Sequence, residues 1–478
     1  MSILKAARCS LIFISYAKVD KICGPAGNSS VNDVGILLFR KQDRAYNQTP
    51  AGRRQCAVRS DFGNQGGEVL PAWSKGEMDI HFINTMTGEC VFVIMPDGTQ
   101  LLVDAASSLV KTNSNGSTTN TGIRSRWDPT LTGTRGSQLI GMYLKKCMAW
   151  TGNNTIDYIV NTHLHNDHFG DSNSSLPVSS NSSTYRLNGI PEILDNFKVG
   201  AVLDRGWPDY DYPFDMQTLS SNKAAVKNYV NAVKWHVENS GVKAEMFRAG
   251  VTDQIVPKTS DYKVTVRNIA VNGNIWTGNG TETKMTFPEK KDIVVANPAK
   301  IAGTDKCPAE NICSCVMKIS YGNFDFFTGG DLQYNNRSNF SWKDAELPCA
   351  KAAGRVEVMK ADHHGSEATN SPEALTILSP QVIVVNSWVD VHPRTSIMSQ
   401  MWKTLPTMDL FITNFCRGER PVGVDNKVSD ADAAKVKGYD GNIVVRVREG
   451  GSQYYVMTTS DSDGKMTVKN VSGPYKSR

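Results

Sequence analysis

The distribution of histidine is the feature of this sequence that most restricts what the chain can fold into. The 478 residues contain eight histidines, and six of them fall in three short segments that each follow an apolar run typical of a strand. Because side chains at the carboxyl ends of strands in an α/β sheet meet at one edge, we expect the three segments to converge. The six residues are His163, His165, His168, His363, His364 and His392.

The segment HLHNDH has the donor spacing of a metal site. His163 and His165 alternate with one leucine, so both imidazoles project the same way from an extended turn, while Asp167 and His168 can fold back towards a neighbouring position. Imidazole and carboxylate donors together suit zinc-class ions. The ten cysteines are scattered without paired CxxC elements, so we expect histidine and carboxylate, not thiolate, to hold any metal.

HLHNDH resembles the HxHxDH signature of the metallo-β-lactamase superfamily and matches it residue for residue. FFTGGDL resembles the strand of that superfamily that ends in a bridging aspartate. KADHHGS and VNSWVDVHP resemble the branch related to DNA-uptake competence proteins and phosphorylcholine esterases. The resemblance implies an α/β fold, namely a four-layer αββα metallo-β-lactamase-like sandwich with a long insertion. It covers roughly residues 78 to 460.

The resemblance also implies a binuclear site. His163 and His165 would hold the first ion, and Asp331, which ends FFTGGDL, would bridge it to the second. Asp167 and His168 would hold the second ion, and His392 would complete that second site. The two divalent ions are expected to be zinc, with manganese or iron as alternatives. The metal ligands expected on this basis are His163, His165, Asp167, His168, Asp331, His364 and His392.

The adjacent residues His363 and His364 are expected to have different roles. One of them would complete the first site, and we expect His364 because a glycine follows it, although the choice between the two stays open. The other would donate a proton or contact a substrate oxygen. The residues expected to take part in catalysis are Asp167, His363 and His364.

Four further residues have expected supporting or structural roles. Asp104 and Asp362 are candidates to accept the second N–H of a metal-bound imidazole, with a local turn contact as the alternative. His236, within an amphipathic segment over residues 221–239, is expected to be structural, and His81 to be packed inside a strand.

Hydrolysis is the expected chemistry, because a metal ion lowers the pKa of bound water towards ~7. A hydroxide bridging two zinc-class ions would attack a phosphodiester or related phosphoester. Alternatives are a lactone, thioester or β-lactam hydrolase on the same site, a mononuclear iron dioxygenase, or a non-catalytic binding module. Arg205, in VLDRGWPDYDYP, is a candidate cation for a substrate phosphate, and a rigid surface loop is the alternative interpretation.

The chain divides into three expected regions. Residues 1–70 are irregular and predict an N-terminal extension or leader; residues 71–478 would form the hydrolase domain, with an insertion-rich middle over 172–310. Within the domain, Pro96-Asp97-Gly98 predicts a strand-turn-strand unit, and Gly450-Gly451 predicts the turn of a hairpin.

Composition narrows the partners but leaves the compartment open. The net charge of +5 is spread without long basic runs, so charge does not indicate nucleic acid as a partner, while a small-molecule or phosphoester substrate fits. No run reaches the ~18 consecutive apolar residues of a membrane-spanning helix. We therefore expect a soluble protein, cytoplasmic or exported, since CSLIFISYA is a weak signal-like segment. The oligomeric state stays open.

Overall fold

All the residues that the computed structural model describes lie within the unit Asp61–Arg478. The expected extension over residues 1–70 falls almost wholly outside the described residues, so its boundary stays a prediction. The described residues are 66–106, 136–301, 305–334, 340–387, 391–417, 427–462 and 464–478.

The first of two nine-stranded sheets joins strands from distant parts of the sequence. Its order is β18-β17-β16-β1-β2-β3-β4-β5-β6. The pairs from β18 to β3 are antiparallel, and the pairs from β3 to β6 are parallel. The strands are β1 (Met78–Phe82), β2 (Val91–Ile94), β3 (Gln100–Val103), β4 (Thr155–Val160), β5 (Lys198–Asp204), β6 (Lys243–Met246), β16 (Asn442–Val447), β17 (Gln453–Thr459) and β18 (Val468–Lys476).

The second sheet has the order β15-β14-β13-β12-β11-β10-β7-β8-β9. It is parallel from β11 to β15 and antiparallel from β11 through β10 and β7 to β9. The strands are β7 (Val264–Val271), β8 (Asn274–Trp276), β9 (Thr283–Met285), β10 (Val316–Tyr321), β11 (Phe324–Thr328), β12 (Val358–Lys360), β13 (Val382–Val385), β14 (Asp409–Ile412) and β15 (Val436–Tyr439).

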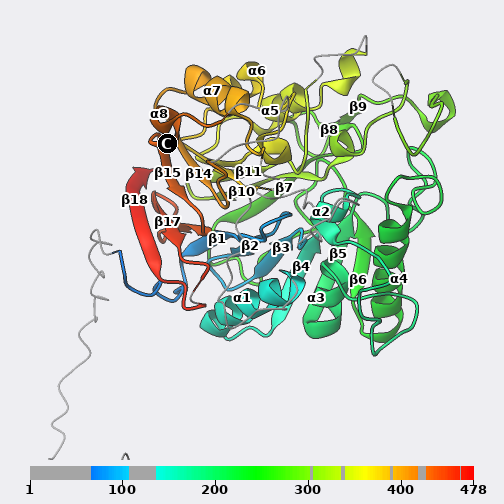
Figure 1. Ribbon diagram of the computed structural model, residues 1–478, viewed down its shortest axis with the longest axis horizontal. Helices are drawn as coiled ribbons and strands as arrows, with labels where there is room; N and C mark the ends of the chain where they lie inside the picture. Colours follow the sequence, from blue (N-terminus) through cyan, green and yellow to red (C-terminus); the bar gives the residue numbers. More distant parts are fainter. Residues whose placement is uncertain are drawn as a thin grey trace, which may run out of the picture. The chain divides into compact units, whose positions relative to one another are not determined.

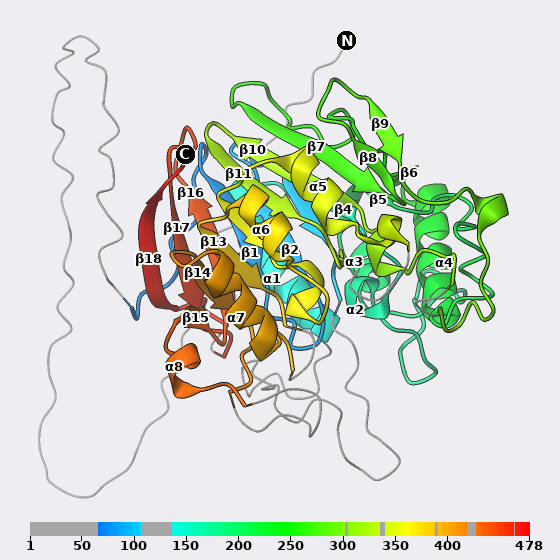
Figure 2. The ribbon, with the colours of Figure 1, turned by 90° about the horizontal axis from the view of Figure 1, so that it is seen from above.

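Helices cover the outer face of each sheet, which makes four layers (Figure 1). Residues of α1, α3 and α4 pack against the first sheet, and residues of α5, α6 and α7 pack against the second, as Figure 2 shows from above. The helices are α1 (Gly136–Thr151), α2 (Asn166–Phe169), α3 (Ile190–Asn196), α4 (Lys223–Asn239), α5 (Glu346–Ala353), α6 (Pro372–Leu378), α7 (Thr395–Thr404) and α8 (Asp430–Ala433).

The central strands are apolar on both faces because each face is covered. In β2, Val91 and Val93 point into the core between the sheets, whereas Phe92 and Ile94 pack against the helices. The residues of β13 alternate in the same way. Full burial of each such side chain contributes about 1.5–3 kcal/mol, so this doubly buried pattern is what holds the sandwich together.

The observed architecture confirms the expected αββα sandwich. The insertion expected over residues 172–310 does not stand apart from it, because this region supplies β5 and β6 to the first sheet and β7, β8 and β9 to the second. Its Ser- and Asn-rich start over residues 172–189 carries no strand-like pattern. Among the described helices, none combines the length and apolarity that crossing a membrane requires.

Candidate metal centre

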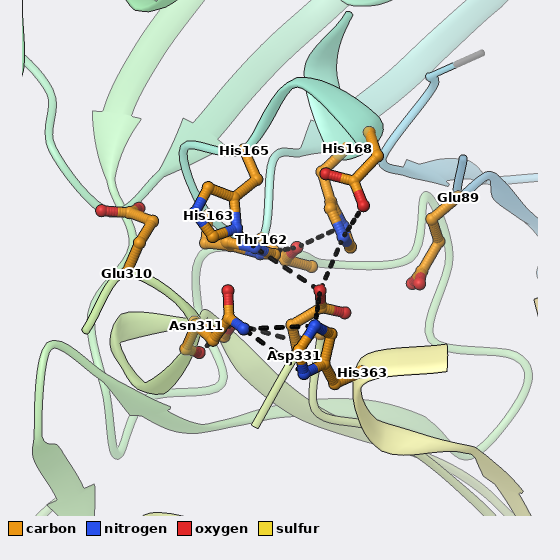
Figure 3. A network of polar contacts seen from close by, with 12 residues as sticks. Glu89, Thr162, His163, His165, His168, Glu310, Asn311, Asp331 and His363 are labelled. Carbon is orange, nitrogen blue, oxygen red and sulfur yellow. Dashed lines mark hydrogen bonds and ion pairs between the residues drawn. The ribbon is translucent and has the colours of Figure 1, made fainter. Parts of the chain in front are cut away.

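The candidate ligands follow strands of both sheets at one edge of the sandwich. HLHNDH follows β4 and leads into the short helix α2, and Asp104 directly follows β3, the parallel neighbour of β4. In the second sheet, Asp331 follows β11, and His363 and His364 follow the parallel neighbour β12. Figure 3 shows His163, His165 and His168 on one side of the centre and Asp331 and His363 on the other.

Asp331 lies at the middle of the cluster. Its Oδ2 is 3.2 Å from Nε2 of His168 and 3.6 Å from Nε2 of His364. The same oxygen is 3.7 Å from Nε2 of His163 and 3.7 Å from Nε2 of His363. With a residue exposure of 1 %, this carboxylate is screened from solvent while four imidazoles surround it.

Two groups of donors share this carboxylate, and in each group the donor atoms lie within 4.8 Å of one another. Asp167 lies beside the second group, because its Oδ2 is 3.4 Å from Nε2 of His364 and 3.9 Å from Nε2 of His168. The first group is His163, His165 and Asp331, and the second is Glu89, His168, Asp331 and His364.

Two expectations about the second half of the chain need correction. We expected His364 to complete the first site, but the structure groups it with His168 and places it next to Asp167. We expected His392 to complete the second site, but neither donor group of the described residues contains it. The ring of His392 instead stacks on His364, with 5.8 Å between centroids and 9° between planes. Adjacent positions in a turn point in different directions, and sequence spacing did not indicate which direction each ring takes.

Hydrogen bonds behind the rings fix which nitrogen faces the centre. Asp104 accepts from Nδ1 of His168 at 2.8 Å and also from the backbone N–H and the hydroxyl of Thr162. Nδ1 of His364 is 2.7 Å from the carbonyl oxygen of Asn386. Each contact directs Nε2 towards Asp331. Asp362 has no such role in the described contacts, which join it to Asn370.

The cluster fits a bound cation. Both carboxylate oxygens of Asp331 and Nε2 of His168 are buried without a hydrogen-bond partner among the described residues. An unpaired buried polar atom costs about 1–3 kcal/mol, and one shared ion would satisfy all three. Burial, with the neighbouring His168, holds the pKa of His163 well below its usual value, so this ring is neutral and has a lone pair to offer. Burial lowers the pKa of His168, but Asp331 and Asp104 outweigh it and raise that pKa well above its usual value, which shows that the centre attracts positive charge.

Sequence reasoning missed two charged residues of this cluster. Glu89 comes from the turn before β2, and its Oε2 is 2.7 Å from Nζ of Lys360, with both side chains fully buried. Nζ of Lys360 also donates to the carbonyl oxygen of Gly330 at 2.6 Å and is 3.7 Å from Oδ1 of Asp331. Lys360 could have been noticed in the sequence, because a lysine is unusual in an apolar strand such as β12. No local pattern indicates Glu89.

The rings of His363 and His364 point in different directions because the backbone at both residues is unusual. Their φ angles are 46° and 54°, so two consecutive non-glycine residues adopt the left-handed region. Histidine enters this region more readily than most residues, and such strain is concentrated at functional sites. The side chain of His363 is 15 % exposed, whereas that of His364 is fully buried. The amides of Asn311 and Gln333 contact the ring of His363 at 3.3 Å and 3.1 Å.

The phosphate-binding role considered for Arg205 is not supported. Its residue exposure is 1 %, and its guanidinium forms a two-point ion pair with Glu310. It also donates to the carbonyl oxygen of Tyr212 and the side-chain oxygen of Asn272. Each of the three guanidinium nitrogens donates to protein, so this buried cation stabilises loops.

The other two histidines lie outside the donor groups. His81 in β1 contacts the hydroxyl of Tyr143 at 2.9 Å inside the fold. His236 in α4 contacts Asp195 at 3.1 Å and Tyr185 at 3.2 Å, which ties α4 to α3 and to the loop before it. These packed positions agree with the structural roles expected for both rings.

The fold and the centre together define an α/β protein with grouped metal-binding side chains. Residues 132–243, which include HLHNDH, match the family model of the metallo-beta-lactamase superfamily. Over these residues the chain is similar to this superfamily. A curated relative, Recombination protein 2 from Haemophilus influenzae, is 24 % identical over 152 residues, which is 31 % of this chain and 16 % of that protein.

Solved structures with a distant likeness include the metallo-beta-lactamase fold protein YhfI from Bacillus subtilis. It has 9 % sequence identity and a TM-score of 0.32, over 71 % of this chain and 97 % of that one. A protein from Parabacteroides distasonis, provisionally described as a metal-dependent hydrolase, has 11 % identity and a TM-score of 0.30, over 72 % of this chain and 97 % of that one.

Proposed function

We propose that this protein is a hydrolase that holds two divalent metal ions, preferably zinc, and cleaves a phosphodiester or a related phosphoester. The observation that carries the proposal is the position of Asp331, whose carboxylate belongs to both donor groups. A carboxylate shared by two cations offsets part of their mutual repulsion and keeps them close. When bound, the two ions supply Lewis acidity and make hydroxide available near neutral pH.

The donor groups suggest how the ligands divide. His163 and His165 hold the first ion, and His168 and His364 hold the second, with Asp331 common to both. We assign Asp167 to the second ion because its carboxylate lies beside the same two imidazole nitrogens. Glu89 belongs to the second donor group, and its negative charge is balanced there by the positive charge of Lys360.

His363 is the ring that contacts a substrate oxygen in this proposal, because burial lowers its pKa to about 4 and leaves it neutral near pH 7. It is the one ring of the four around Asp331 that reaches solvent, and therefore the one that substrate can meet. Asn311 and Gln333 contact the ring and hold it in place.

The choice of a phosphoester rests on the resemblance of KADHHGS and its neighbouring segments to the competence-protein branch, and the match to Recombination protein 2 supports it. Since Arg205 is engaged by Glu310, the charge of a phosphate would be met by the metal ions. A lactone, thioester or β-lactam could use the same ligands, and an iron dioxygenase would hold one iron.

The test combines metal analysis with turnover of the purified full-length chain. We expect about two zinc or manganese ions per chain and chelator-sensitive hydrolysis of bis(p-nitrophenyl) phosphate. Nitrocefin, a lactone and a thioester serve as comparison substrates. Two metal ions with turnover of only these comparison substrates would overturn the phosphoester assignment. One iron per chain would indicate an oxidoreductase. A metal-free protein would indicate a non-catalytic binding module.

A further inference from the structure

The backbone that carries the first two metal-binding histidines is held from the opposite half of the fold. Leu164 lies between His163 and His165, and its backbone N–H donates to Oε1 of Glu310 at 2.6 Å. Glu310 precedes β10 of the second sheet, whereas HLHNDH follows β4 of the first. Figure 3 shows Glu310 on the side of the centre where His163 and His165 lie. A change at Glu310 would therefore reach the first donor group through the residue between its two imidazoles.

Arg205 fixes the direction of the Glu310 carboxylate. Its Nε donates to Oε1 at 2.5 Å and its Nη2 donates to Oε2, while Nη1 donates to Tyr212 and Asn272. The side chain of Glu310 is 9 % exposed. Burial raises the pKa of this carboxyl group, but the Arg205 guanidinium outweighs burial and lowers the pKa below its usual value. The group that accepts from Leu164 is thus an ionised carboxylate, which forms a stronger hydrogen bond than a neutral oxygen does.

The ring of His165 has little other support. Within the described part of the chain, its one hydrogen-bond contact joins Nδ1 to Nε2 of His163 at 3.0 Å. The rings of His168 and His364 in the second donor group each have a hydrogen-bond partner behind them. Metal-bound imidazoles usually have such a partner. The direction of His165 depends instead on its backbone, which Glu310 holds on one side and the first turn of α2 holds on the other.

We infer that Glu310 is a positioning residue for the first metal ion, and this inference rests on the proposed two-ion function. Through the N–H of Leu164, the carboxylate fixes the chain from which His163 and His165 extend. The second donor group has supports of its own. Removal of the acceptor should therefore weaken binding of the first ion and leave the affinity for the second ion unchanged.

The experiment measures zinc binding to the metal-free full-length protein in competition with a chromophoric chelator, so it needs no turnover. We expect two binding steps in the wild type. His165→Ala should remove the step of the first ion and His364→Ala that of the second, which assigns the two steps. Two matched double variants then combine Arg205→Met with either Glu310→Ala or Glu310→Gln. Both lack the buried ion pair, but only the variant with Glu310→Gln keeps an oxygen that can accept from Leu164.

The comparison of the two double variants decides the inference. The Kd of the first zinc ion should be at least about tenfold higher with Glu310→Ala than with Glu310→Gln, because loss of a group that supports metal ligands costs 10–100-fold in affinity. The Kd of the second ion should be equal in both. Equal values for the first ion, or a loss confined to the second ion, would overturn the inference and leave the two-ion centre intact. A wild type that binds fewer than two zinc ions would overturn the proposed function itself.

Two further variants exclude a general effect on folding. The control is Asp97→Ala, which removes a carboxylate that accepts from the backbone N–H groups of Thr99 and Thr259 at 2.9 Å, outside both donor groups. It should change neither Kd, and urea denaturation should show cooperative unfolding of every variant. If the double variant with Glu310→Ala does not fold, Glu310→Asp replaces it, because it keeps both charges and draws the carboxylate back from Leu164 by one methylene. An unchanged Kd of the first ion in Glu310→Asp would then refute the inference.

Discussion

A single oxygen of Asp331 connects the two donor groups, so a change of one atom tests the proposed centre. Asp331→Asn keeps the volume of the side chain and removes its charge, and His165→Ala removes a ligand of the first ion. We expect each change to abolish hydrolysis, a loss of more than about a hundredfold in kcat/KM, because altering even the partners of metal ligands costs 10–100-fold. Steady-state kinetics and urea denaturation measure activity and folding separately.

The control for Asp331→Asn is Asp253→Asn, at a side chain that is 68 % exposed and remote from the donor groups. Both variants should unfold cooperatively, and the control should keep its activity. Full activity in either Asp331→Asn or His165→Ala would refute the proposed centre.

The buried pair of Glu89 and Lys360 makes a prediction about stability. Lys360→Met leaves the Glu89 carboxylate buried without its partner, which typically costs about 3–5 kcal/mol. Glu89→Gln combined with Lys360→Met removes both charges, and we expect much of the loss to be recovered. Urea denaturation of chelator-treated protein gives the free energy of unfolding for each variant.

Lys435→Met is the matched control, because Lys435 and Asp432 form an exposed pair at 2.8 Å. Pairs of that kind contribute about 0.2–1 kcal/mol. If Lys360→Met lowered the free energy of unfolding no more than the control does, the charge of Lys360 would not be needed to balance that of Glu89.

The imidazoles of the candidate site could be predicted from sequence, but its charge balance could not. HLHNDH is a local pattern, and strand ends bring such patterns together in any α/β sheet. Glu89 reaches the site from a turn that no motif marks, and the directions of His363 and His364 depend on left-handed backbone angles. The role of Arg205 stayed open because its partner Glu310 lies far along the chain.

At the scale of elements, one ion pair joins two strands that are distant in sequence. Asp79 of β1 and Arg446 of β16 are register partners, and their side chains meet at 2.6 Å and 2.8 Å inside the fold. Burial raises the pKa of Asp79, but the Arg446 guanidinium outweighs it and lowers the pKa to about 2, from an ordinary value of 3.8.

This shift predicts a pH dependence of stability. Because the folded pKa is depressed, the pair's contribution is present above about pH 4 and is lost as pH falls through 2; it amounts to about 2 kcal/mol. Urea denaturation at several pH values from 5 to 2 should show a larger loss for the wild type than for Asp79→Asn combined with Arg446→Met. Parallel curves for the two proteins would contradict the prediction.

Short-range elements of the fold were predictable, and long-range pairings were not. The turn at Pro96-Asp97-Gly98 does separate β2 from β3, and Gly450-Gly451 lies between β16 and β17, because glycine and proline restrict the chain locally. The amphipathic segment over residues 221–239 is confirmed as α4. No local sequence pattern predicts that β1 pairs with β16, because that pairing depends on the burial of both strands in one core.

For the whole molecule, metal binding should be measurable as stability. Ions that bind the folded protein and not the unfolded chain stabilise it by about 2.7 kcal/mol per site at a hundredfold excess over Kd. We therefore expect chelation to lower the Tm and zinc to restore it. Thermal denaturation of wild type and Asp331→Asn, with and without zinc, measures this, and a zinc response that Asp331→Asn fails to reduce would place the ions elsewhere.

The pairing of β1 with β16 also affects how the protein is made. A ribosome releases the amino end of a chain first, so β1 emerges well before its partner β16 has been synthesised. In that interval the edge of β1 is unpaired and apolar, and such an edge can be extended by strands of other chains. This edge of β1 therefore stays open to other chains until residues 442–447 have been synthesised.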